Sequence, residues 1–139
     1  MIKFFSENDF QIQKEEALID WLSSIISSEE CTLGDVSFIF CSDDFLHGIN
    51  LEFLDHDTFT DIISFDYSLG NELHGEIYMS TERIIENANE LSLPFLDELH
   101  RVIVHGVLHL CGYKDKTKED ASKMRQKENE ALATRKSVK

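Results

Sequence analysis

The sequence lacks a long apolar run and an export signal. No stretch of its 139 residues approaches the roughly 20 consecutive apolar residues that span a bilayer. The first ten residues, MIKFFSENDF, turn acidic and contain no long apolar segment with a small-residue cleavage site. We therefore expect a cytoplasmic protein with no membrane partner.

Cysteine and proline are also scarce. The three cysteines, Cys31, Cys41 and Cys111, form no CxxC pair, so they indicate reduced, packed thiols rather than a zinc knuckle or a disulfide framework. There is one proline, Pro94, and no low-complexity linker or internal repeat. Apolar residues make up 42% of the chain and include ten phenylalanines, which is ample for a core. Residues 1–139 are expected to form a single domain.

Basic side chains are few over most of the chain. Residues 1–113 carry 22 acidic and 4 basic side chains, residues 114–139 carry 5 acidic and 9 basic ones, and the net charge is −14. An acidic body opposes broad, non-specific binding of nucleic acid. The basic end is either a solvated terminal helix or a local contact for a polyanion.

The periodicity of apolar residues predicts a mixture of strands and helices. Strands are expected at 2–5, 35–41, 60–68 and 76–80, with turn chemistry at 69–75. Helices are expected at 13–28, 43–54, 81–91, from Pro94 to about Cys111, and at 117–133. The order does not alternate as regular βαβ units. We therefore expect an α+β fold, with one small mixed β-sheet of about four strands packed with about five helices.

Two histidines interrupt the most apolar helix. His105 and His109 are four residues apart, so their rings project from one helix face and can reach one zinc ion. HxxxH pairs are often ordinary core histidines, but two imidazoles in so apolar a helix are costly unless they are paired. Gly106 costs about 1 kcal/mol relative to alanine inside a helix, which indicates a close approach. The turn at Gly112 then brings Asp115 back toward the helix end.

The peptidase motif HExxH is absent. In that motif a glutamate beside the first histidine acts as general base, and Gly106 occupies the corresponding position here. This absence counts against a peptidase, although a metal-dependent hydrolase of another substrate stays open as an alternative.

The stretch HGVLHLCGYKD (105–115) resembles the signature HGxLHLxGYDH of the YbeY family, metal-dependent endoribonucleases of rRNA maturation. The resemblance extends over roughly residues 35–132. TDIISF (60–65) is similar to the family's TDVLSF segment, HGEIYMS (74–80) to its GDIxIS strand, and NLEF (50–53) to its N-x-x-Y stretch. Met124 and Glu128 match the recurrent Met and Glu of the last helix.

The resemblance implies a zinc site. His105 and His109 match the first two ligand histidines, and Asp115 takes the place of the third. A carboxylate binds zinc at about 2.0–2.2 Å, so His105, His109 and Asp115 are the expected metal ligands, with Zn²⁺ or another divalent transition metal as cofactor. Compared with three histidines, this set makes the metal a weaker Lewis acid. The alternative is that Asp115 caps the last helix or faces solvent.

A second departure concerns phosphate binding. The family's Tyr-Arg pair reads Phe53-Leu54 here, and leucine cannot stabilise a phosphate as arginine does. Lys114, which replaces the acidic residue of the signature, is the candidate substrate-binding cation. His56 and Arg101 are further candidates, and each of the three is more typical of an ordinary surface residue.

Polar residues within the segment TDIISF, together with Glu76, complete the candidate site. Asp61 and Glu76 are the candidate catalytic carboxylates, and Thr60 and Ser64 are candidate substrate-binding residues. Strand-end capping is the alternative for Asp61, and an outward-facing strand position is the alternative for Glu76.

The remaining histidines are expected to have other roles: His74 is interpreted as a loop residue, and His47 and His100 as helical residues that face solvent or core.

The resemblance implies a single-strand endoribonuclease. Its role would be maturation of the 3′ end of small-subunit rRNA and ribosome quality control, with rRNA precursor and the small ribosomal subunit as partners and a monomer as the favoured state. A non-catalytic ribosome-assembly factor with the same fold is the alternative that Leu54 and the acidic body favour.

Overall fold

The computed structural model describes residues 1–54 and 60–135. Within them the chain forms four strands: β1 (Ile2–Ser6), β2 (Thr32–Cys41), β3 (Ile62–Asp66) and β4 (Glu72–Ser80). It also forms five helices: α1 (Glu15–Ser28), α2 (Asp43–Leu54), α3 (Thr81–Glu90), α4 (Phe95–Leu110) and α5 (Lys118–Ala133). Among the described residues, every helix is too short or too polar to span a bilayer.

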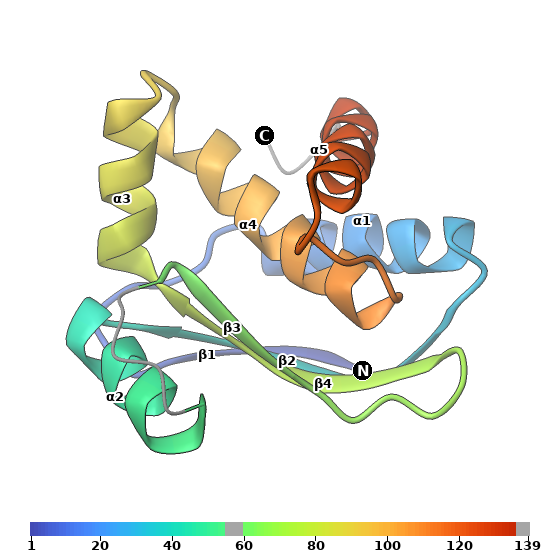
Figure 1. The fold of residues 1–139 in the computed structure, drawn as a ribbon, viewed down its shortest axis with the longest axis horizontal. Coiled ribbons are helices and arrows are strands. Elements are labelled where there is room, and N and C mark those ends of the chain that lie inside the picture. Colours follow the sequence, from blue (N-terminus) through green and yellow to red (C-terminus); the bar gives the residue numbers. More distant parts are fainter. Residues whose placement is uncertain (55–59, 136–139) are drawn as a thin grey trace.

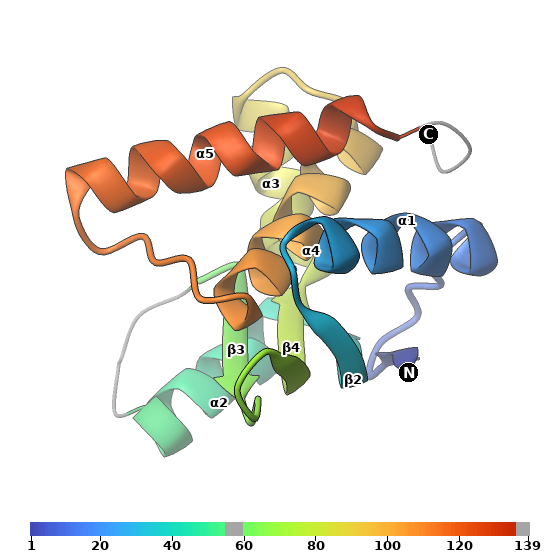
Figure 2. The same cartoon turned by 90° about the vertical axis from the view of Figure 1, so that its right-hand side faces the viewer.

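The strands form one mixed sheet in the order β1-β2-β4-β3. β1 and β4 both run parallel to β2, whereas β3 pairs antiparallel with β4 as a hairpin. Figure 1 shows α2 below the sheet and the other four helices above it. Figure 2 shows α5 above α4. The expected α+β class, with a small mixed sheet and five helices, is therefore confirmed.

Helices cover both faces of the sheet. Side chains of successive strand residues point to opposite faces, so each strand contributes to both apolar layers. On β4, Leu73, Ile77 and Met79 belong to the main core beneath α1 and α4. Tyr78 points to the other face, where it packs in a smaller cluster with Leu46 of α2. A residue's position along a strand therefore decides which of two apolar layers it enters.

The hairpin differs from its prediction. The turn is shorter than residues 69–75, because Gly70 adopts a φ of 60° and lets the chain reverse at once. Residues of the expected turn consequently join β4, among them His74. His74 was expected in a loop, but its Nε2 lies 2.5 Å from Glu72 Oε1 within the strand.

Gly106 allows α4 to lie directly on the sheet. A β-carbon at this position would come within 2.9 Å of Ile77 and 3.1 Å of Ile62. The close approach predicted for Gly106 is therefore confirmed. At the end of the helix, Gly112 has a φ of 106°, which few other residues adopt, and it turns the chain away from α4.

The last helix is held by few apolar residues. Met124 and Ala131 are buried, whereas Ala121 is exposed. The inner face of α5 instead carries Glu128, which is 3% exposed. A carboxylate at this position requires polar partners, because burying an unpaired charge is costly.

The stability of this fold should fall in mild acid because of His100. This buried core histidine accepts a hydrogen bond at Nδ1 from Arg135 at 2.8 Å, which requires a neutral ring. Burial and the charge of Arg135 lower the pKa of His100 to about 4. Because the unfolded chain binds the proton near pH 6.5, stability should decrease as the pH falls from 6.5 to 4, by roughly 3 kcal/mol.

Urea unfolding between pH 7 and 4 measures this loss. In the His100→Gln variant, the part due to His100 should be missing, so its stability curve should be flatter over the same range. Equal slopes for the two proteins would contradict the assignment.

Candidate metal centre

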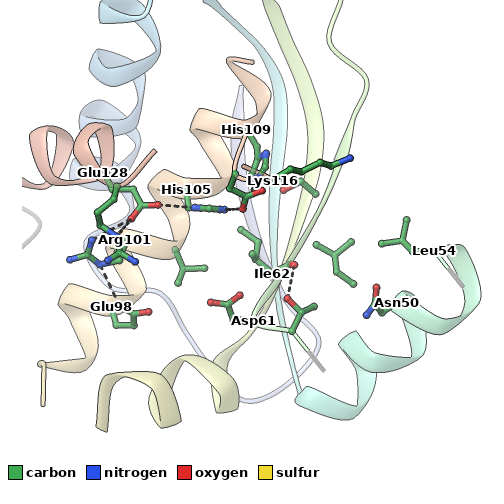
Figure 3. A pocket seen from close by; sticks show the side chains of 16 residues that line it. Asn50, Leu54, Asp61, Ile62, Glu98, Arg101, His105, His109, Lys116 and Glu128 are labelled. Atoms are coloured by element: carbon green, nitrogen blue, oxygen red, sulfur yellow. Dashed lines mark hydrogen bonds and ion pairs between the residues drawn. The ribbon is translucent and has the colours of Figure 1, made fainter. Parts of the chain in front are cut away.

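One face of α4 carries the polar residues of the site. Glu98, Arg101, His105 and His109 recur every three or four residues, so they point in one direction along the helix. All four line a cavity of about 780 Å³ between α4, the start of β3 and the end of α2. In Figure 3 these side chains project from α4, with Arg101 directed toward Glu98 and Glu128 and with Asp61 and Ile62 across the cavity.

Three side chains meet at one end of this cavity. Asp115 Oδ2 lies 3.2 Å from His105 Nε2 and 3.5 Å from His109 Nε2. One ligand atom from each residue lies within 4.8 Å of those of the other two. The turn at Gly112 thus returns Asp115 to the histidine pair, as the sequence suggested.

The spacing of these atoms fits a tetrahedral metal ion. Ligand bonds of about 2.0–2.2 Å place the ligand atoms of such an ion roughly 3.3–3.6 Å apart. The two measured separations from Asp115 Oδ2, 3.2 and 3.5 Å, are close to that range. Three protein ligands leave a fourth position for water or substrate, as in catalytic zinc sites.

Glu128 orients the first histidine. Its Oε2 lies 2.7 Å from His105 Nδ1, so a proton on Nδ1 is donated to the carboxylate and Nε2 keeps its lone pair for a metal. Burial lowers the pKa of His105, but the hydrogen bond to Glu128 and the charges of Glu128, Asp115 and Asp61 outweigh it and raise the pKa. Glu128 was noted in the sequence only as a matching residue of the last helix.

The pKa of His109 is shifted in the opposite direction to that of His105. Burial and the neighbouring charge of His105 lower its pKa, and Asp115 offsets this only in part. The rings of His105 and His109 lie 4.7 Å apart between centroids, nearly perpendicular to each other. A neutral His109 is the form that binds a metal ion.

A buried ion-pair network adjoins the histidines. Arg101 lies 3.3 Å from Glu128 and 3.5 Å from Glu98, and its side chain is only 17% exposed. It is therefore not the ordinary surface residue that the sequence favoured. Arg101 Nε and Glu98 Oε1 form an ion pair without the geometry of a hydrogen bond. The contact with Glu98 is therefore weaker than the contact with Glu128. Burial raises the pKa of Glu98.

The opposite wall comes from the segment that begins β3. Thr60, Asp61 and Ser64 line the cavity. Burial raises the pKa of Asp61. Asn87 Nδ2 donates a long hydrogen bond of 3.5 Å to Asp61 Oδ2. The structure thus brings these three candidates to the same cavity as the histidines.

Two candidates lie elsewhere. Glu76 points to the face covered by α2, where it lines an aromatic groove with Phe53 and Tyr78. Its position corrects the prediction that it acts beside the metal. Lys114 lines a separate hollow with Tyr113 and not the cavity of the histidines, so its substrate-binding role stays a prediction.

Among the described residues, the end of α2 contributes only uncharged side chains to the cavity wall. Leu54 lines the cavity, while Phe53 contacts Phe65 on the α2 face of the sheet. His56 lies outside the described residues. Lys116, which the sequence did not single out, lines the cavity.

Comparisons with known proteins find similarity over most of the chain. The family model described as Endoribonuclease YbeY matches residues 3–136. The chain is 56% identical over 132 residues to the Endoribonuclease YbeY of Christiangramia forsetii, covering 95% of this chain and 92% of that protein. It is 53% identical over 133 residues to that of Flavobacterium johnsoniae, covering 96% of each.

A solved structure has the same fold. The solution structure of TM1509 from Thermotoga maritima superposes with a TM-score of 0.64 at 31% identity, covering 96% of this chain and 90% of that one.

Proposed function

Because the chain belongs to the YbeY family of endoribonucleases, we propose that it is a metal-dependent hydrolase that cleaves single-stranded rRNA precursors. The observation that carries the metal dependence is the meeting of His105, His109 and Asp115 at separations that suit a tetrahedral ion. The cellular role would be maturation of the 3′ end of small-subunit rRNA and ribosome quality control.

The chemistry is divided among the residues of the cavity. Nε2 of His105, Nε2 of His109 and the carboxylate of Asp115 would hold the metal. A divalent cation bound there would polarise a phosphodiester oxygen and activate water for attack on phosphorus. Glu128 holds the His105 ring in the tautomer that presents Nε2.

Proton transfer is assigned to Asp61. Its carboxyl lines the cavity, and burial raises its pKa, so it exchanges a proton closer to neutral pH than an exposed aspartate does. Thr60 and Ser64 are hydroxyl donors on the same wall and would bind substrate oxygen atoms.

The ligand set also affects the choice of metal. Asp115 gives the site one more negative charge than a third histidine would, which weakens the metal as a Lewis acid. Zn²⁺ is the first choice, and two histidines with a carboxylate also accommodate iron, manganese or nickel.

The partners follow from the substrate. With a net charge of −14, the chain should bind RNA through a local site rather than through its whole surface. We propose that it acts as a monomer on rRNA precursor at the small ribosomal subunit.

The test is cleavage of a fluorescent single-stranded RNA by the purified protein. Metal analysis should find about one ion per chain. A chelator should abolish cleavage, and adding back one equivalent of Zn²⁺ should restore it, since the metal supplies several kcal/mol of charge stabilisation. Cleavage that persists unchanged after complete metal removal would contradict the proposal.

A further inference from the structure

The cavity contains more acid than base, although its proposed substrate is a polyanion. Four carboxylates line it: Asp61, Glu98, Asp115 and Glu128. Among the described residues, its cationic lining consists of Arg101, Lys116 and Arg125. A divalent ion held by His105, His109 and Asp115 would offset part of this negative charge at the metal itself. A neighbouring phosphate of the strand would still gain from a side-chain cation that these carboxylates do not neutralise.

Two of the three cations are engaged with carboxylates. Arg101 is held between Glu98 and Glu128, and its Nη1 also donates to Asn129 at 3.2 Å. Arg125 lies 3.6 Å from Glu128. If Arg101 left Glu128 to bind phosphate, the buried carboxylate would lose one of its partners, which is costly. Arg125 is 59% exposed, and its ion pair with Glu128 is the longer of the two.

Lys116 is in a different situation. It follows Asp115 directly and is exposed, and no hydrogen bond or ion pair ties its ammonium to any part of the chain that the structure describes. In Figure 3 its side chain lies beside His109 and extends away from Arg101 and Glu128. The ammonium can therefore reach an incoming phosphate without breaking an existing contact.

We infer that Lys116 is the substrate-binding cation of this active site. Its ammonium contacts the backbone phosphate of RNA that neighbours the phosphate bound at the metal centre. The inference rests on the proposed function. A lysine suits this position, because a compact charge on a flexible stem accepts the variable geometry of a single strand.

The test compares Lys116→Ala with Lys123→Ala. Both variants remove one exposed lysine, but Lys123 lies on α5 outside this cavity. Lys116→Ala should raise KM for single-stranded RNA about tenfold with a smaller change in kcat, as expected for the loss of one charge-assisted contact. Lys116→Arg should restore most of the affinity, and Lys123→Ala should resemble the wild type.

The salt dependence of binding provides a second measurement. The affinity for the same RNA, measured with metal removed so that the strand stays intact, should fall less steeply with salt in Lys116→Ala. The slope of log affinity against log salt should shrink by about 0.7, the value for one phosphate contact on a single strand.

The outcomes separate the two proposals. If wild type cleaves RNA and Lys116→Ala matches Lys123→Ala in KM and salt slope, this inference fails while the proposed function stands. If Lys116→Ala loses bound zinc, the lysine acts through Asp115, and the phosphate contact is overturned. If wild-type protein neither binds nor cleaves RNA, both proposals fail.

Discussion

Replacing His109 with alanine should reduce the rate of RNA cleavage by about a hundredfold or more. The variant keeps Nε2 of His105 and the Asp115 carboxylate, but two ligands rarely retain a metal ion against solvent. The rate should fall because the charge stabilisation that the metal supplies, several kcal/mol, is lost with it. The measurement is the single-turnover rate on a fluorescent single-stranded RNA, together with zinc content per chain.

The fold should survive this change. The His109 side chain is 30% exposed at the cavity, so its removal leaves the apolar core intact. His74→Ala is the matched control, because His74 lies on β4 outside the cavity and pairs with Glu72. Equal cleavage by wild type and His109→Ala would contradict the proposal of a metal-dependent endoribonuclease, provided that both proteins unfold at similar temperatures.

Replacing Asp115 with alanine should weaken zinc binding by at least about a hundredfold. Losing a hydrogen-bond partner of a ligand typically costs 10- to 100-fold in affinity, and losing the ligand itself should cost at least as much. Asp115→His should instead tighten zinc binding, since imidazole suits zinc and three histidines form a common catalytic set. Competition with a chromogenic chelator measures both affinities.

The control for Asp115 is another exposed acid. Glu119→Ala removes one negative charge near the start of α5, at a position outside the cavity. It should leave zinc affinity unchanged, which separates ligation from a general effect of net charge. Unchanged zinc affinity in Asp115→Ala itself would show that the carboxylate is not a ligand.

Local periodicity was sufficient to predict much of this site. The four-residue spacing of His105 and His109 places both rings on one face of any α-helix, whatever packs around it. The close approach at Gly106 could be predicted because glycine in an apolar helix interior has a cost that packing must offset. In the same way, the positive φ of Gly112 is a local property of a helix end.

The predictions that failed concern residues whose local sequence pattern is compatible with two different ways of packing. Alternation along β4 places Glu76 and Tyr78 on one face and Ile77 on the other, but helices cover both faces of this sheet. Strand periodicity alone could not say which face looks toward the histidines. Lys114 and Lys116 follow Gly112 in an irregular turn, so no period relates their directions.

Glu128 illustrates what sequence patterns leave out. It is one of several acidic residues on a polar helix, and it lies 23 residues after His105. Its burial, its bond to His105 and its contact with Arg101 arise only when α5 docks on α4.

The histidine pair, the turn that follows it and the mixed α+β class can be predicted from local sequence, because they depend on the period of one element and on the conformations open to glycine. Tertiary packing is needed to bring Asp115 to the histidines, to let Glu128 orient one of them, and to place Lys116 rather than Lys114 at the cavity. Such contacts join separate elements, and their geometry is set by how the helices pack on two covered faces of one sheet.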